Sequence, residues 1–237
     1  MAVGSAVVIG AGGGIGAALV RGVVAQGRYR AVHALSRRGA AGIEGATPGR
    51  IDLTDEASIA AAFKRIEDDI DLVLIASGIL HDGDHRPERR LRELGADWMA
   101  RNFAVNAIGP ALVIKHAAAR LPRNRRSVVA ALSARVGSIS DNRIGGWYGY
   151  RASKAALNML VRTAAIEVAR SRPQAVVAAL HPGTVDTPLS APFQGGVAPE
   201  KLFVPDRSAA AMLAVIDGLN GQASGRIFAW DGSEIAP

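Results

Sequence analysis

Short apolar runs rich in β-branched residues alternate with longer segments of helical periodicity along the whole chain. The apolar runs are Ser5–Gly10, Ala31–Leu35, Asp71–Ser77, Ser127–Ser133, Ala175–His181 and Arg226–Trp230. The segments with helical spacing between them are Ile15–Gln26, Asp55–Asp68, Ala96–Ala119, Tyr150–Arg170 and Asp206–Leu219. Runs that are apolar on both faces are typical of strands in a parallel sheet that helices cover on each side. The alternation therefore predicts an α/β fold with a doubly wound parallel sheet.

Length and composition favour one well-packed domain. A single α/β domain accounts for 237 residues, and no linker or repeat interrupts the pattern. Apolar residues make up 49% of the chain and charged residues 21%, which excludes wholesale disorder. The chain contains no cysteine, which excludes disulfides, thiolate metal sites and cysteine nucleophiles.

The charge pattern does not indicate a nucleic-acid-binding surface, although the formal net charge is +7. The basic residues are scattered, and only 5% of the residues are aromatic, so no mixed basic and aromatic platform for stacking bases is present. No apolar run reaches the roughly 18 residues that a membrane-spanning helix needs. The segment from Met1 to Gly10 lacks the basic stretch of a secretion signal. We therefore expect a cytoplasmic protein that binds neither nucleic acid nor membranes.

The turn after the first predicted strand is rich in glycine. It reads Gly10-Ala11-Gly12-Gly13-Gly14-Ile15-Gly16, and a predicted helix follows. Glycines allow a tight turn and let backbone N–H groups approach a pyrophosphate at a helix N-terminus. Two registers fit the dinucleotide pattern: Gly12, Gly14 and Ala17, or Gly10, Gly14 and Gly16. The second is favoured because the strand ends immediately before Gly10. The turn predicts a Rossmann-type dinucleotide site.

The residues after the second predicted strand indicate which dinucleotide binds. A carboxylate about 20 residues past the glycines would bind the 2′-hydroxyl of NAD(H). This chain instead has Ser36-Arg37-Arg38, and two guanidinium groups suit the 2′-phosphate of NADP(H). Asp52 stands at the expected end of a third strand, where it can accept a hydrogen bond from the adenine amino group. We predict NADP(H) in preference to NAD(H).

Tyr150 and Lys154 are spaced so that both side chains lie on one face of a predicted helix. An ammonium group beside a phenol favours the phenolate and lowers the tyrosine pKa towards the working pH. The pair therefore indicates a tyrosine that acts as a general acid/base. Such a pair is a weak signal alone, but the glycine turn far upstream makes a chance occurrence improbable.

These motifs together resemble those of the short-chain dehydrogenase/reductase family over essentially the whole chain. Gly10, Gly14 and Gly16 match its cofactor turn, and Tyr150-x-x-x-Lys154 matches its catalytic pair. Asn106, in AVNAIGP, matches the asparagine of its fourth helix, and the segment 181–187 resembles the family's P-G-x-V-x-T segment beside the nicotinamide. The stretches ARVGSISDN and GGWYGYRASKAALN are most similar to the C-factor/sniffer-like carbonyl reductase branch.

The resemblance implies a role for each matching residue. Tyr150 would be the general acid/base, and Lys154 would hold the nicotinamide ribose and tune Tyr150. Asn106 would support a water molecule in a proton relay, and Ser133 would hydrogen-bond the substrate carbonyl. We expect a cofactor-binding half over residues 1–125 and a catalytic and substrate-lid half over residues 126–237. The expected cofactor-binding residues are Gly10, Gly12, Gly13, Gly14, Ile15, Gly16, Ser36, Arg37, Arg38, Asp52, Leu53, Ala76, Ser77, Gly78, Tyr150, Lys154, Pro182, Gly183, Val185 and Thr187.

The chain departs from the family's pattern in three places. Ile9 replaces the threonine that usually precedes the glycine turn, and 76–78 reads Ala-Ser-Gly in place of the usual N-A-G. The usual serine pair after the fifth strand is Ser133-Ala134 here, so the second serine is missing. Ser133 is favoured as the substrate-binding serine because it ends an apolar strand. Ser138, which is closer to Tyr150 in the sequence, is the alternative.

The function expected from these residues is reversible, NADP(H)-dependent reduction of a small, mostly apolar aldehyde or ketone to the alcohol. The alternative is an NADP(H)-binding redox-sensing or signalling module with little turnover. The segment Pro188–Pro205 is interpreted as a lid over the substrate. The charged segment 81–85, which includes Asp84, is interpreted as a solvated loop, and no metal site is expected. The apolar faces of the helix that begins at Tyr150 favour a homodimer or homotetramer.

Overall fold

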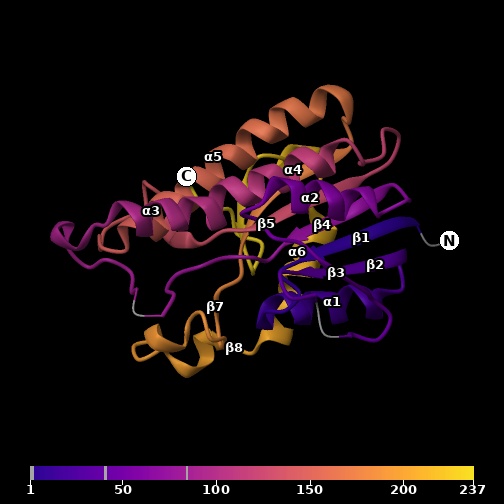
Figure 1. The fold of residues 1–237 in the computed structure, drawn as a ribbon. Helices are drawn as coiled ribbons and strands as arrows, with labels where there is room; N and C mark the ends of the chain where they lie inside the picture. Colours follow the sequence, from indigo (N-terminus) through magenta and orange to yellow (C-terminus); the bar gives the residue numbers. More distant parts are fainter. Residues whose placement is uncertain (1–2, 40–41, 84) are drawn as a thin grey trace.

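A computed structural model describes residues 3–39, 42–83 and 85–237, and it contains a sheet of seven parallel strands between two layers of helices (Figure 1). The strands lie in the order β3-β2-β1-β4-β5-β6-β9, so the winding direction reverses between β1 and β4. This is the doubly wound, Rossmann-type sheet that the sequence predicts. In chain order the strands are β1 (Val3–Ile9), β2 (Tyr29–Ser36), β3 (Thr47–Arg50), β4 (Ile70–Ile75), β5 (Ser127–Leu132), β6 (Ala175–His181) and β9 (Ile227–Ala229).

Helices cover both faces of the sheet (Figure 1). On one face lie α2 (Glu56–Lys64), α4 (Gly109–Ala118) and α5 (Tyr148–Ser171), and on the other lie α1 (Gly14–Gln26) and α6 (Pro205–Gly218). Local sequence accounts for several helix ends. Asp55 caps α2, because its carboxylate accepts a hydrogen bond from the amide of Ala57. Gly27 ends α1 in the left-handed conformation, with φ of 60°, which glycine adopts without strain.

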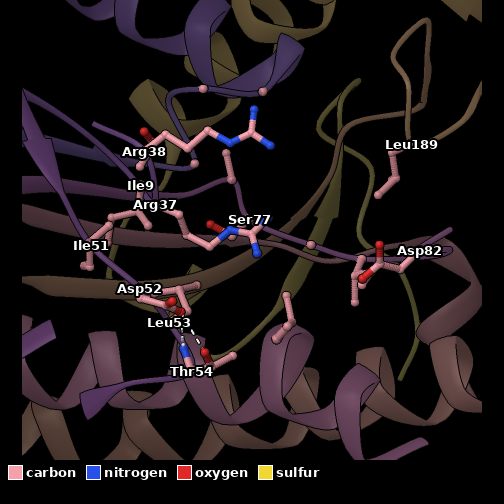
Figure 2. Close-up of a pocket in the computed structure, with 18 of the residues that line it drawn as sticks. Ile9, Arg37, Arg38, Ile51, Asp52, Leu53, Thr54, Ser77, Asp82 and Leu189 are labelled. Atoms are coloured by element: carbon pink, nitrogen blue, oxygen red, sulfur yellow. Dashed lines mark hydrogen bonds between the residues drawn. The ribbon is translucent and has the colours of Figure 1, made fainter. Parts of the chain in front are cut away.

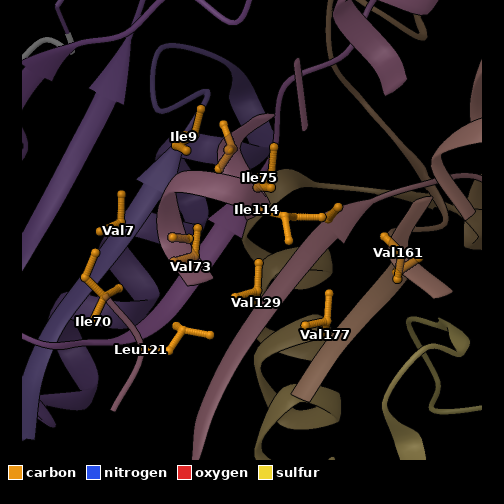
Figure 3. Packing of buried hydrophobic residues seen from close by; sticks show 14 of the residues in the cluster. Val7, Ile9, Ile70, Val73, Ile75, Ile114, Leu121, Val129, Val161 and Val177 are labelled. Atoms are coloured by element: carbon orange, nitrogen blue, oxygen red, sulfur yellow. The ribbon is translucent and has the colours of Figure 1, made fainter. Parts of the chain in front are cut away.

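Two apolar layers hold the helices on the sheet, because successive strand residues point to opposite faces. Val7, Val73 and Val129 face α2, α4 and α5, and Figure 3 shows how these side chains interlock with Ile114 and Val161. Neighbouring strand residues, which include Val8, Leu74 and Val128, face α1 and α6. The central strands β4 and β5 are therefore buried on both faces, as the apolar runs predict.

The predicted helix over 96–119 is divided by one wider turn. It consists of α3 (Ala96–Phe103), a π-helical turn over Ala104–Ile108 and α4. The wide turn contains Asn106, whose side chain is fully buried. Such turns occur frequently at functional sites, since the extra residue redirects a side chain.

A short parallel pair, β7 (Thr184–Val185) with β8 (Leu202–Phe203), joins the two ends of the expected lid segment. Single helical turns lie at Leu91–Glu93, Arg135–Gly137, Ala191–Phe193, Pro199–Lys201 and Gly221–Ala223. Across the part of the chain that the structure describes, no helix has both the length and the apolarity needed to cross a bilayer.

Candidate active site

The carboxyl ends of the parallel strands meet at one edge of the sheet, and most of the predicted site residues lie there. Ile9 of β1 is paired with Ile75 of β4, and Leu132 of β5 is paired with Leu180 of β6. The segments that follow these four strands, which contain Gly10, Ala76, Ser133 and Pro182, are therefore neighbours. The switch in strand order between β1 and β4 places a crevice at this edge, where open α/β sheets bind their ligands.

The glycine turn depends on a close approach between Gly10 and Gly16. Gly10 has φ of 88°, a conformation that L side chains rarely adopt, and its carbonyl oxygen accepts a hydrogen bond from the amide of Gly13. A Cβ on Gly16 would lie 2.6 Å from the carbonyl carbon of Gly10. In the register Gly10, Gly14 and Gly16, each position therefore disfavours a side chain, either because of its backbone conformation or because a Cβ would be crowded. A Cβ on Gly14 would lie 3.0 Å from the Thr187 methyl group, which brings the turn next to the segment after β7.

A cavity of about 650 Å³ extends along the carboxyl edge from the glycine turn (Figure 2). Arg37 and Arg38 lie at one end of it, and Asp82 and Leu189 lie at the other. The volume of this cavity is suitable for a dinucleotide, since ligand cavities usually measure roughly 300–1,000 Å³. The predicted cofactor residues that line it are Gly10, Gly12, Gly13, Ser36, Arg37, Arg38, Asp52, Leu53, Ala76, Ser77 and Gly78.

The other predicted cofactor residues do not line this cavity. Ile15 and Gly16 are in the first turn of α1, where Gly16 is buried against Gly10. The remaining members of the predicted set, which follow β6 or lie on α5, are Pro182, Gly183, Val185, Thr187, Tyr150 and Lys154. Gly14 borders Thr187 and does not line the cavity either.

Asp52 is held as a carboxylate acceptor beside the arginine end of the cavity. Its Oδ1 accepts hydrogen bonds from the amide of Thr54 at 2.9 Å and from the Thr54 hydroxyl at 2.7 Å. These bonds, followed by the positive charges of Arg37 and Arg101, hold the pKa of Asp52 below its ordinary value. An ionised Asp52 therefore remains available at neutral pH as an acceptor at the base of the cavity.

Tyr150 and Lys154 lie together in the first two turns of α5. The Lys154 ammonium is 5.8 Å from the centre of the Tyr150 ring and donates a hydrogen bond of 2.7 Å to the carbonyl oxygen of Leu132. Burial raises the pKa of Tyr150 to about 12 and lowers the pKa of Lys154 to about 8. The spacing predicts that the lysine lowers the tyrosine pKa, whereas in the structure burial of the phenol raises it.

Asn106 connects the wide helical turn to the loop after β4 and to α5. Its Oδ1 accepts a hydrogen bond from the amide of Ile79 at 2.8 Å, and its Nδ2 donates to the carbonyl oxygen of Ile79 at 2.9 Å. Nδ2 also lies 3.1 Å from the hydroxyl oxygen of Ser153, and that hydroxyl donates to the carbonyl oxygen of Tyr150. Two successive hydrogen bonds through the Ser153 hydroxyl thus connect Asn106 to the backbone of Tyr150.

Both candidate serines are buried and hydrogen-bonded within the protein. The Ser133 hydroxyl donates to Oδ1 of Asn158 on α5 at 2.6 Å. The Ser138 hydroxyl accepts from the amide of Asp141 at 3.2 Å and lies 3.4 Å from that of Ser140. Neither lines the cavity, so the choice between Ser133 and Ser138 stays a prediction.

Three aromatic rings form a wall beside Tyr150. Trp147 meets Tyr150 edge-on with ring centres 6.2 Å apart, and Phe193 of the expected lid meets Trp147 at 5.1 Å. Phe193 also meets His81 at 5.8 Å, and Nε2 of His81 lies 3.1 Å from the carbonyl oxygen of Pro188. The lid segment is therefore in contact both with the loop after β4 and with the start of α5.

Several cavity residues have no signal in the sequence. Arg101 and Val105 come from α3 and the wide turn, and Ile79, His81 and Asp82 come from the loop after β4. Their place depends on how the charged segment after β4 folds across the edge of the sheet, which periodicity does not encode. Trp98 does not join this cavity; it stacks on His85, with ring centres 5.0 Å apart. Asp84 lies outside the described residues, and those described contain no cluster of three or more metal-ligating side chains.

Comparisons with known proteins agree with this geometry. The family described as "short chain dehydrogenase" matches residues 5–196. C-signal of Myxococcus xanthus is 43% identical over 141 residues, which are 58% of this chain and 77% of that protein. A Rhodococcus 1-hydroxy-2-glutathionyl-2-methyl-3-butene dehydrogenase is 32% identical over 192 residues, 78% of this chain and 77% of that protein. The NADPH-bound carbonyl reductase from chicken fatty liver superposes with a TM-score of 0.86 at 24% identity, over 100% of this chain and 95% of that chain.

Proposed function

Because the chain belongs to the short-chain dehydrogenase family of oxidoreductases, we propose that it reduces a small, mostly apolar aldehyde or ketone to the alcohol with NADPH. The observation that carries this proposal is the pair of Tyr150 and Lys154 at the carboxyl edge of the sheet: Lys154 is hydrogen-bonded to the last residue of β5 and lies next to Gly78, which lines a cavity of dinucleotide size. The reaction is reversible, so the same site oxidises the alcohol with NADP⁺.

Arg37 and Arg38 support the choice of NADP(H). Both side chains line the same end of the cavity, and two guanidinium groups match the charge and planar geometry of a 2′-phosphate. The carboxylate that would bind the free ribose hydroxyls of NAD(H) is absent from the end of β2. The chicken carbonyl reductase that shares the fold was solved with NADPH bound, which agrees with this assignment.

The chain's own groups bind the cofactor, orient the carbonyl and move one proton. The glycine turn at the N-terminus of α1 cradles the pyrophosphate, and Asp52 accepts from the adenine amino group. Lys154, which lies one helical turn after Tyr150 on the same face of α5, holds the nicotinamide ribose. When bound, NADPH supplies the hydride to the carbonyl carbon. The Tyr150 hydroxyl donates its proton to the carbonyl oxygen, and a pKa near 12 before binding keeps it protonated for that step.

The aromatic wall supports the proposed substrate class. Trp147 and Phe193 present ring edges and faces next to Tyr150, and Leu189 adds an aliphatic side chain from the lid segment. Such a surface favours an apolar substrate whose one polar group is the carbonyl. Closure of the lid over this wall would exclude water from the reacting atoms.

Turnover of a carbonyl panel tests the proposal. Purified wild-type protein and the Tyr150→Phe variant are given NADPH or NADH with aldehydes, ketones and diketones, and near-UV absorbance reports cofactor oxidation. We expect oxidation of NADPH with apolar carbonyls by the wild type and a loss of about 10²-fold or more in kcat for the variant. An equal turnover of the two proteins would refute the role of Tyr150.

A second function has one observation in its favour. The Ser133 hydroxyl donates its hydrogen bond to Asn158, and Ala134 stands in place of the second serine. A substrate carbonyl therefore has fewer free hydrogen-bond donors here than in a family member with both serines. A module that binds NADP(H) and senses or signals its redox state would need no such donor, and the relative C-signal has a signalling name. This reading predicts that NADPH raises the melting temperature while no carbonyl of the panel is reduced.

The exposed face of α5 supports self-association. Met159 and Ile166 lie two helical turns apart on that helix with 66% and 50% of their surfaces exposed. Apolar side chains at this spacing suit an antiparallel contact with the same helix of a second copy, as in a homodimer or one half of a homotetramer. Light scattering of the wild type and of Met159→Glu tests this, and a monomeric wild-type mass would refute it.

A further inference from the structure

Glu88 connects the charged segment after β4 to the helix that carries Tyr150. It is almost fully buried, with 3% of its surface exposed, although the surrounding segment Arg86–Arg92 contains four arginines. Its Oε2 accepts a hydrogen bond of 3.1 Å from the amide of Gly149, and its backbone carbonyl accepts one of 2.5 Å from the amide of Trp147. Glu88, which is far from α5 in the sequence, therefore accepts hydrogen bonds from two backbone amides at the start of α5, those of Trp147 and Gly149.

The start of α5 needs such an external partner. The first amides of a helix have no acceptor within it, and the Trp147 side chain, which occupies the capping position, accepts none of them. Trp147 also has φ of 52°, a left-handed conformation that is strained for a tryptophan. A carboxylate at this helix end satisfies one amide and is favoured by the partial positive charge there.

The carboxyl group of Glu88 is committed to this contact. A Cβ on Gly149 would lie 2.9 Å from Oε1, so the carboxyl group packs directly against the helix backbone. Among the described residues, Oε1 has no hydrogen-bond partner, which leaves the bond to Gly149 as the one that the side chain makes. Burial of a carboxyl group with so few partners is costly, and such sites persist where they serve a function.

The two hydrogen bonds to Glu88 hold residues that lie around the reacting Tyr150 hydroxyl. Gly149 precedes Tyr150, and the indole of Trp147 meets both the Tyr150 ring and Phe193 of the lid. We propose that Glu88 is a positioning residue, which fixes the Tyr150 hydroxyl and the Trp147 ring relative to the substrate carbonyl. The proposal rests on the proposed function for its effect on the rate, but the contact itself is testable without it.

Four variants separate positioning from simple loss of a carboxylate. Glu88→Ala removes the acceptor, and Glu88→Asp withdraws it by one carbon. Glu88→Gln keeps an oxygen that can accept from Gly149. The matched control is Glu93→Ala, because Glu93 is an exposed carboxylate of the same segment that accepts a local hydrogen bond from the amide of Arg89.

We expect kcat to fall 10- to 100-fold in Glu88→Ala and Glu88→Asp, since a displacement of about 1 Å in a catalytic group can cost 10²-fold. Glu88→Gln and Glu93→Ala should stay within about threefold of the wild type, and KM for NADPH should stay within about twofold in all four. If Glu88→Ala fails to fold, Glu88→Asp decides. Wild-type kcat in a folded Glu88→Asp variant would overturn the proposal.

The Tyr150→Phe background supplies a readout that a general structural defect would not produce. If Glu88 acts through Tyr150, adding Glu88→Asp to Tyr150→Phe should leave the residual rate unchanged within about twofold. A further drop by the same factor as in the wild-type background would assign Glu88 a structural role only. Full activity of Tyr150→Phe alone would instead refute the proposed function.

Hydrogen exchange tests the contact independently of activity. The amide of Gly149 should exchange at least tenfold faster in Glu88→Ala than in Glu93→Ala, and the Glu88→Gln variant should resemble the wild type. Unchanged exchange in Glu88→Ala would show that the carboxylate does not hold the helix, whatever the turnover of the protein.

Discussion

The substitution Gly16→Ala should destabilise the fold, because Gly16 is the glycine of the turn with the least room. A Cβ there would lie closest to the Gly10 carbonyl oxygen and 2.6 Å from the Gly10 carbonyl carbon, and both are backbone atoms, which cannot rotate away. Reaching an ordinary separation of about 3.5 Å from that oxygen requires α1 to move by more than about 1 Å from the end of β1. Overpacking of this kind costs typically 1–3 kcal/mol, and we expect about 3 kcal/mol here.

The matched control is Gly12→Ala in the same turn. A Cβ on Gly12 would lie 3.5 Å from that of Ser36, an ordinary contact, but Gly12 lines the cavity. At about 2–4 °C per kcal/mol, Gly16→Ala should melt about 6–12 °C below the wild type. Gly12→Ala should melt within about 2 °C of it but bind NADPH at least about tenfold more weakly, or 1.4 kcal/mol. Circular dichroism melts with and without NADPH measure both effects. A Gly16→Ala melting temperature within about 2 °C of the wild type would refute the steric argument.

Two further predictions concern charged groups of the site. Arg37→Ala should raise the Kd for NADPH by about tenfold or more and leave the Kd for NADH unchanged, because only NADPH carries the 2′-phosphate. Calorimetry measures both constants. An equal loss of affinity for the two cofactors would contradict the assignment of Arg37 to the 2′-phosphate. Lys154→Met should raise the unfolding free energy near pH 7 by about 1–3 kcal/mol, because burial lowers the pKa of this ammonium from 10.5 to about 8. Between those two pKa values the unfolded chain binds more protons than the folded one, so wild-type stability rises with pH and the advantage of Lys154→Met shrinks. Urea unfolding near pH 7 and near pH 10 checks this, and an advantage that grows with pH would contradict it.

Local pattern was sufficient for the sheet and for the glycine turn. Apart from Asp71 and Ser127, the β4 and β5 strands are apolar because both of their faces are buried, and this signal is independent of distant contacts. Gly10 and Gly16 stand where the backbone demands them, so their spacing is visible in the sequence. The boundary of β3 was less clear, because Thr47–Arg50 is polar and lies at the edge of the sheet.

The contacts around Tyr150 could not be predicted, because they join segments that are far apart in the chain. The bond from Gly149 to Glu88 depends on the path of the loop after β4, and a buried glutamate in a charged run has the sequence signature of a solvated one. The wide turn at Asn106 breaks a pattern that reads as one helix. The pKa of Tyr150 illustrates the same limit, since the spacing indicates the nearby Lys154 but not the burial that raises the pKa.

We propose that Tyr150 donates the proton in an NADPH-dependent carbonyl reduction. The most direct measurement is a single turnover, in which wild type and Tyr150→Phe, each saturated with NADPH, are mixed with the same apolar ketone and followed by near-UV absorbance. We expect the wild type to oxidise its NADPH and the variant to do so about 10²-fold more slowly, while NADPH raises both melting temperatures equally. Equal rates of NADPH oxidation by the two proteins would contradict the claim.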